Sequence, residues 1–111
     1  MSIILFPGQG SQFVGMGKRL LSMPKVVRMF EIANDILKFD LLALCLNGPK
    51  AELDRTDRCQ AAVFVTSLAA VEHLKETNPT AIANCYATAG FSVGEYCSLV
   101  LSDVLPYEDG M

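Results

Sequence analysis

The chain has 111 residues, of which 51% are hydrophobic and 19% are charged, and 9 Lys and Arg against 12 Asp and Glu give a net charge of −3. This length fits one small domain or part of a larger one, and the apolar content excludes an intrinsically disordered chain. No basic run points to nucleic acid as a partner, and no apolar run of roughly 18 residues predicts a membrane span.

The first half of the chain predicts one buried strand followed by short helices. An apolar run closed by Pro-Gly is typical of a strand, and apolar residues at helical spacing after Pro24 predict an amphipathic helix. An Asn-Gly-Pro stop signal ends the next apolar stretch. The predicted segments are a strand over 3–6, a Gly-rich loop over 7–17 leading into a helix that reaches residue 23, helices over 25–37 and 41–46, and at most one helical turn within 50–56.

The second half predicts a long helix, a second strand and another helix. The Ala-rich segment 60–75 is the longest apolar stretch, and we expect its helix to end before Pro79. A strand is predicted over 85–89, a sharp turn leads into a helix that reaches Leu101, and a further helix is predicted to start within 106–110. This order predicts an α/β fold, a parallel sheet with flanking helices. Because two strands make an incomplete sheet, we expect the first part of a longer protein.

Residues 90–94 read Gly-Phe-Ser-Val-Gly, a G-x-S-x-G motif between the second strand and its helix. This context is that of a nucleophile elbow, in which Gly90 and Gly94 allow a tight turn and Ser92 projects from the end of the strand. The first amides of the helix could then stabilise an oxyanion. An alternative stays open, because Ser92 and Glu95 also fit a capping box without chemistry.

The loop after the first strand reads Gly-Gln-Gly-Ser-Gln over residues 8–12. It matches neither a dinucleotide fingerprint nor a phosphate-binding loop. The carboxyl ends of parallel strands lie at one edge of a sheet, so the Gln9 amide could face Ser92 as a second oxyanion donor. A tight turn with polar filling is the alternative.

No complete serine–histidine–acid set can be assembled from these residues. The only histidine is His73, which we interpret as a solvent-facing residue of the long helix. The four cysteines match no zinc spacing, so we expect buried thiols in a reducing compartment and no metal site. Met1 leads into an apolar run too short for a signal peptide.

Three segments together resemble the malonyl-CoA:acyl carrier protein transacylases. They are Phe-Pro-Gly-Gln-Gly-Ser-Gln over residues 6–12 with Gly-Met-Gly at 15–17, Leu-Asp-Arg-Thr at 53–56 with Cys-Gln at 59–60, and Gly-Phe-Ser-Val-Gly-Glu-Tyr over 90–96. The resemblance spans essentially the whole chain. It implies that residues 1–111 are the N-terminal part of an acyltransferase domain: a partial α/β-hydrolase-like large subdomain without the ferredoxin-like insert.

The resemblance also implies a two-step reaction. Ser92 would take the malonyl group from malonyl-CoA as an ester, with the backbone amides of Gln9 and Val93 as the oxyanion hole. The phosphopantetheine thiol of acyl carrier protein would then accept it, in fatty acid synthesis. Malonyl-CoA is a substrate, and no bound cofactor is implied. The family's carboxylate-binding arginine and its histidine base fall beyond Met111, so we expect little or no transfer by this piece alone.

Phe91 stands where bacterial members usually have His, and with residues 68–72 it makes the chain most similar to animal mitochondrial members. The resemblance therefore implies a mitochondrial location, although this chain carries no targeting segment. Two other interpretations stay open: part of a serine hydrolase or esterase, which would share the elbow, and a non-catalytic truncated product whose open strand edges favour aggregation.

Overall fold

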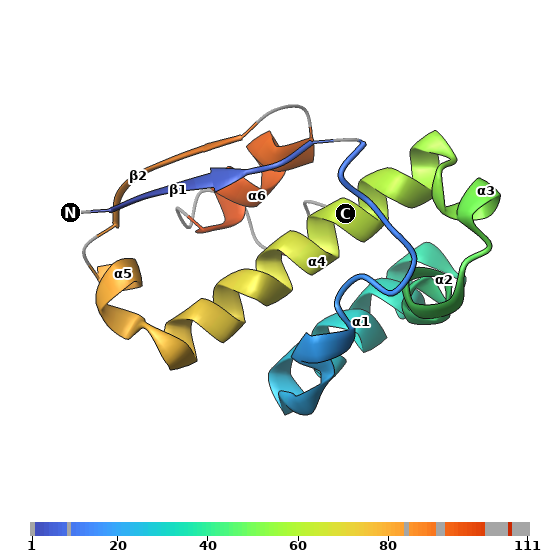
Figure 1. Cartoon of the computed structure of the whole chain (residues 1–111), viewed down its shortest axis with the longest axis horizontal. Coiled ribbons are helices and arrows are strands. Elements are labelled where there is room, and N and C mark those ends of the chain that lie inside the picture. The colour runs from blue at the N-terminus through green and yellow to red at the C-terminus, as the bar shows by residue number, and fades with distance from the viewer. Residues whose placement is uncertain (1, 9, 84, 91–92, 102–106, 108–111) are drawn as a thin grey trace.

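The computed structural model describes residues 2–8, 10–83, 85–90, 93–101 and 107. The elements in chain order are β1 (Ser2–Phe6), the 3-10 helix η1 (Lys18–Ser22), α1 (Pro24–Leu37), α2 (Leu41–Asn47), α3 (Lys50–Leu53), α4 (Thr56–Thr77), α5 (Pro79–Ala83), β2 (Cys85–Gly90) and α6 (Val93–Leu101). Figure 1 shows the two strands side by side, with α6 packed on them and α4 running the length of the molecule. Helices α1, α2 and α3 also pack on α4.

The two strands pair in parallel, which confirms the predicted sheet. Their register aligns Phe6 with Gly90, so both strands end at the same edge. Side chains alternate between the faces of β1: Phe6 is buried, whereas Leu5 is 74% exposed. Among the described residues Leu5 is therefore uncovered, although parallel sheets are ordinarily covered on both faces.

Helix α4 is the centre of the core. The four consecutive residues 62–65 are all buried, so every face of the helix is covered at this level. Three of these four residues are small or β-branched (Ala and Val), and α1 and α6 both pack on the helix. This arrangement explains why the segment looks uniformly apolar in the sequence.

Local signals set the ends of α1 and α2. Pro24 occupies the first turn of α1, and Lys38 ends it in the left-handed conformation with φ 64°. The Asp40 carboxylate then accepts a hydrogen bond from the Ala43 amide at 3.0 Å and caps α2. Asn34 joins the two helices by accepting from the Leu41 amide at 2.7 Å.

Most predicted elements are confirmed to within one residue at their ends, and the larger differences concern three helices. The helix expected to reach Met23 is the short 3-10 helix η1, and α4 begins four residues earlier and ends two residues later than expected. Helix α5 was not predicted. Of the helix expected within 106–110, only Tyr107 lies among the described residues, where it is helical.

Candidate active site

The candidate site lies at the edge where β1 and β2 end together. Beyond β1 the chain continues through Pro7 into the loop of residues 8–12, and beyond β2 it reaches α6 at Val93. The parallel register with Phe6 opposite Gly90 brings these two connections to one place. This is the edge at which α/β sheets form their sites.

Two glycines make the turn from β2 into α6 possible. A Cβ on Gly90 would lie 2.1 Å from the carbonyl carbon and oxygen of Gly94, and a Cβ on Gly94 would lie 2.5 Å from the Phe6 carbonyl oxygen. Neither distance is compatible with a side chain. The structure thus has β2 ending at Gly90 and α6 beginning at Val93, with the start of α6 pressed against the end of β1.

The predicted nucleophile Ser92 and oxyanion residue Gln9 both lie outside the described residues. Val93 is the first residue of α6, a position whose backbone amide has no partner within the helix. Gly90 is the last residue of β2, and Gly94 is the second residue of α6. The roles of Ser92, Gln9 and Val93 stay predictions, as does the choice between elbow and capping box.

The loop on the β1 side is held by side chains. Ser11 Oγ donates to the Gly8 carbonyl at 2.9 Å, and the Gly10 amide donates to Gln12 Oε1 at 2.8 Å. Gln12 Nε2 in turn donates to Asp54 Oδ1 at 3.0 Å. Asp54 could not be predicted as part of the site, because residues 42 positions apart give no pattern that would pair them.

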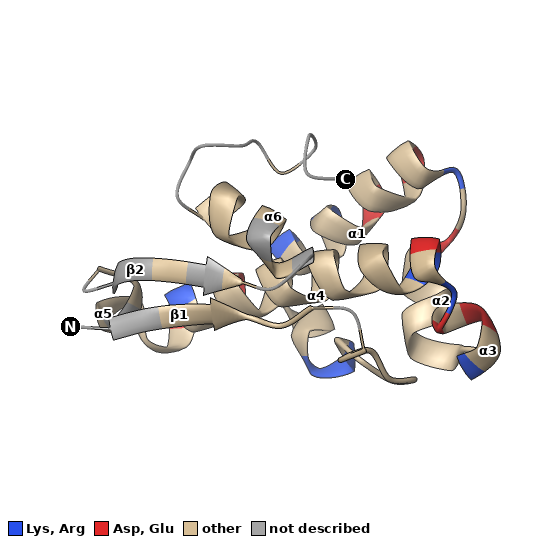
Figure 2. Ribbon diagram, turned by 90° about the horizontal axis from the view of Figure 1, so that it is seen from above, with Lys and Arg blue, Asp and Glu red and all other residues tan. Residues whose placement is uncertain are grey.

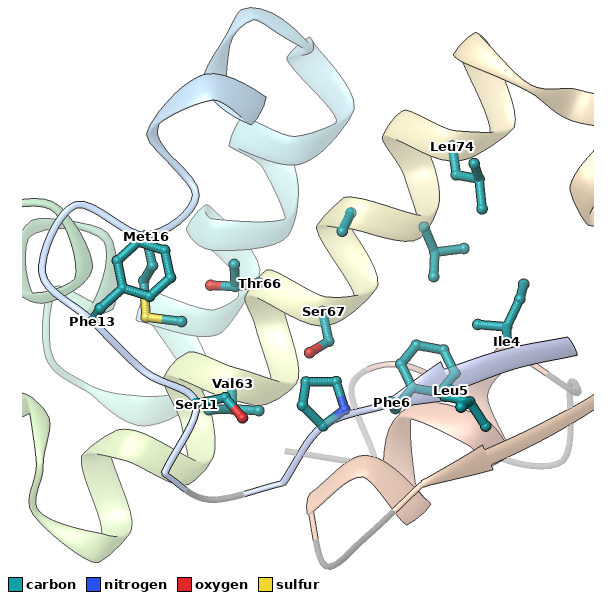
Figure 3. Close-up of a pocket in the computed structure, with 13 residues that line it drawn as sticks. Ile4, Leu5, Phe6, Ser11, Phe13, Met16, Val63, Thr66, Ser67 and Leu74 are labelled. Carbon is teal, nitrogen blue, oxygen red and sulfur yellow. The ribbon is translucent and has the colours of Figure 1, made fainter.

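An apolar pocket of about 340 Å³ opens beside this loop (Figure 3). Side chains of β1, the loop and α4 surround it: Phe13 lies at one end beside Met16, Leu5 lies at the other end on β1, and Ser67 and Leu74 come from α4. Its few polar groups are hydroxyls, including those of Ser11 and Thr66. Such a pocket fits apolar groups and offers no charge to an anion.

Among the described residues, the other titratable side chains form no second candidate site. His73 is exposed on α4, as expected. Cys45, Cys59 and Cys97 are buried free thiols, as expected, and burial raises the pKa of Cys45 to about 11 and that of Cys97 to about 12. Within the part of the chain that the structure describes, no three His, Cys, Asp or Glu residues gather as metal ligands, and no helix is long and apolar enough to cross a membrane.

A comparison with protein-family models matches residues 3–111 to the acyl transferase domain. The chain belongs to the acyl transferase domain family. The resemblance to malonyl-CoA:acyl carrier protein transacylases is also confirmed, because the chain is 54% identical over 110 residues to the mouse protein named malonyl-CoA-acyl carrier protein transacylase, mitochondrial. That alignment covers 99% of this chain and 29% of the mouse protein. The chain thus spans less than a third of this relative.

Solved structures show the same acyl transferase fold. An acyl carrier protein S-malonyltransferase from Vibrio cholerae matches with a TM-score of 0.86 and 36% identity, over 97% of this chain and 35% of that chain. A malonyl-transacylase in complex with a type II polyketide synthase acyl carrier protein, PlMCAT:AntF, matches with a TM-score of 0.86 and 35% identity, over 97% of this chain and 34% of that chain. The predicted α/β fold is therefore confirmed for this acyl transferase segment.

Proposed function

We propose that residues 1–111 form the nucleophile-bearing part of an acyl transferase domain that moves malonyl groups from malonyl-CoA to acyl carrier protein. The observation that carries this proposal is the contact of Gly94 with the Phe6 carbonyl, which sets the start of α6 against the end of β1. Ser92 immediately precedes α6 in the sequence, and the loop of residues 8–12 follows β1. A serine hydrolase could share this contact at its own elbow. The loop of residues 8–12 and the names of the relatives support acyl transfer instead.

In the proposed first half-reaction, Ser92 Oγ attacks the thioester carbonyl carbon of malonyl-CoA. The carbonyl oxygen becomes an oxyanion, which the amides of Gln9 and Val93 stabilise, and the start of α6 adds its positive dipole end. Collapse of this intermediate breaks the C–S bond, and coenzyme A leaves as the thiol with the proton that the serine gave up. The malonyl group stays on Ser92 as an ester.

The second half-reaction reverses these steps with a different thiol. The phosphopantetheine thiol of acyl carrier protein attacks the malonyl ester, and Ser92 regains its proton as the new thioester forms. His73 is not assigned as the base, because it is exposed on α4. By resemblance, the base and the arginine that pairs with the malonyl carboxylate lie outside residues 1–111, so these residues by themselves should acylate slowly and transfer little.

The proposed chemistry uses malonyl-CoA as a substrate and needs no resident cofactor. The partners are acyl carrier protein and a coenzyme A thioester, in keeping with the names of the mouse relative and of the PlMCAT:AntF complex. The mouse relative is named as mitochondrial, which supports a mitochondrial location for this chain.

Intact mass after incubation with malonyl-CoA tests the proposal. We expect a slow gain of one malonyl group, release of coenzyme A, and no gain in Ser92→Ala. An equal gain in Ser92→Ala would overturn the role of the serine. Turnover of p-nitrophenyl acetate faster than that of malonyl-CoA would favour a serine hydrolase. Robust malonyl transfer to acyl carrier protein would contradict the expectation that residues outside 1–111 are needed.

A further inference from the structure

The loop of residues 8–12 is fixed to the end of α3 by one side-chain contact, here called the tether: the hydrogen bond from Gln12 Nε2 to Asp54 Oδ1, at 3.0 Å. Asp54 is the residue that follows the last turn of α3 and caps it. Its other carboxylate oxygen, Oδ2, forms an ion pair with Lys50 Nζ at 2.5 Å. The two oxygens of Asp54 thus have separate partners, one on its own helix and one on the loop.

Gln12 uses both ends of its amide. While Nε2 donates to Asp54, Oε1 accepts from the Gly10 amide at 2.8 Å. Since the side-chain amide is planar, fixing Nε2 also fixes the direction in which Oε1 points. On the other side of position 9, the Gly8 carbonyl accepts from Ser11 Oγ at 2.9 Å. The residues before and after position 9 are therefore both held by loop side chains.

The residues that follow the loop contact α2 and the glycine that ends it. The Gly15 amide donates to the Cys45 carbonyl on α2 at 2.7 Å. Val14 packs against Gly48, where a Cβ would come within 3.1 Å of Val14 Cγ2. Figure 2 shows the charged residues of α3 at the end of the molecule away from the strands. The loop thus reaches from the strand edge to α2 and α3, and the tether is its polar attachment there.

We propose that Gln12 and Asp54 are positioning residues for acyl transfer: the tether holds Gly10 and the described part of the loop of residues 8–12 in place at the edge where β1 and β2 end. This proposal rests on the proposed function and adds two residues to it. Neither side chain would touch the acyl group, so both act through the Gly10 amide and the loop backbone. The Lys50 ammonium and the Gln12 amide hold the pKa of Asp54 below its usual range, so Asp54 is an acceptor at neutral pH.

Hydrogen exchange at the Gly10 amide, followed by NMR on the 111-residue chain, reports directly on the tether. In Asp54→Ala and Gln12→Ala we expect Gly10 to exchange about 2- to 10-fold faster, the range that the loss of one hydrogen bond supports. The double variant should behave like Gln12→Ala, because without Gln12 there is no tether left for the change at Asp54 to remove. Asp54→Asn should stay near the wild type, since its Oδ1 can still accept from Gln12.

The matched control is Lys50→Met, which removes the ion pair but leaves the tether. Its Gly10 exchange should stay within about twofold of the wild type. If the Gly10 amide exchanged as fast in Lys50→Met as in Asp54→Ala, the proposal would be overturned, because the ion pair and not the tether would then hold the loop. Unchanged exchange in Asp54→Ala would overturn it as well.

The rate of malonyl-adduct formation then links the tether to chemistry. At saturating malonyl-CoA we expect Asp54→Ala and Gln12→Ala to acylate about 2- to 10-fold more slowly, with rescue in Asp54→Asn and little change in the concentration that gives half the maximal rate. An acylation rate unchanged in both Ala variants would overturn the positioning role while leaving the proposed function intact. Failure of the wild type to form any adduct would count against the proposed function alone, because Gly10 exchange still decides whether the tether holds the loop.

Discussion

Gly94 lies against the carbonyl of Phe6 so closely that a Cβ at position 94 would come within 2.5 Å of that oxygen. The contact joins the first turn of α6 to the last residue of β1. It is a contact between backbones, which neither partner can relieve by changing a rotamer. The start of α6 and the end of β1 can therefore lie this close only without a side chain at position 94.

Gly94→Ala should destabilise the fold and disrupt the elbow. We expect the free energy of unfolding to fall by about 1–3 kcal/mol, the usual cost of overpacking a filled site, and adduct formation at Ser92 to be lost. Urea unfolding followed by circular dichroism measures the first effect, and intact mass measures the second. The exposed Ser22→Ala serves as the control and should stay within about 0.5 kcal/mol of the wild type. A fully stable Gly94→Ala that still acylates would contradict the close contact.

The ends of β2 and α6 on either side of the motif could be predicted from the sequence because their cause is local. The G-x-S-x-G spacing, a preceding apolar run and a following helical pattern together predict strand, turn and helix, and the structure has β2 ending at Gly90 and α6 beginning at Val93. The parallel pairing also follows from the order of the elements. The contact between Gly94 and Phe6 is a tertiary contact. From the sequence we can predict only that the two strands end at the same edge of the sheet.

The differences between the predicted and the observed structure also have physical reasons. Apolar periodicity located α4 only from Gln60, because the polar first turn at 56–58 is helical through its backbone, with Asp57 favourably placed at the positive end of the helix dipole. Helix α5 has five residues, too few to show a period. The tether between Gln12 and Asp54 depends on how the loop folds over α3, and no local rule predicts that.

The buried thiols should resist alkylation. Burial raises the pKa of Cys45 to about 11, against a smaller lowering by the Thr66 hydroxyl, and that of Cys97 to about 12. At pH 8 only about one Cys45 in a thousand is then a thiolate, against about a quarter for an ordinary thiol of pKa about 8.5. Iodoacetamide labelling with peptide mapping should show both cysteines protected in the native chain and labelled in denaturant. Equal native and denatured rates at Cys97 would show that it is not buried.

Glu72 should make stability depend on pH. It joins α1 to α4 through Lys25 at 3.0 Å and also pairs with Lys75 at 3.2 Å. Burial alone would raise its pKa, but the hydrogen bonds and charges of the two lysines outweigh burial and leave the pKa below its ordinary value of 4.5. Because the folded pKa is the lower one, the contribution of Glu72 is present above the unfolded value and is lost as pH falls through the folded value.

Glu72→Gln should therefore lower the free energy of unfolding at pH 7 by up to about 1 kcal/mol, and the difference from wild type should vanish in acid. Urea midpoints measured between neutral pH and about pH 3 would show this convergence. Glu31→Gln is the matched control, because Glu31 pairs only with Arg28 among the described residues and both side chains are largely exposed. A constant difference at every pH would mean that Glu72 acts through packing and not through charge.

The uncovered sheet face should make the chain self-associate. Leu5 is 74% and Phe13 61% exposed, and both border the apolar pocket of about 340 Å³ beside β1. Exposed apolar surface of this kind is ordinarily covered in a folded protein, and a β1 edge that pairs only with β2 among the described strands adds free backbone groups. Leu5→Thr keeps a residue that favours strands and removes the apolar contact.

We expect Leu5→Thr to raise the concentration at which the chain leaves the monomeric state by about tenfold, equivalent to about 1.4 kcal/mol of lost apolar contact. Size-exclusion chromatography with light scattering over a concentration series gives this value. Ile36→Thr, a change at a residue that is 41% exposed on α1, is the matched control and should leave the value unchanged. If Ile36→Thr were equally effective, association would depend on general hydrophobicity, and the face of β1 would have no special part in it.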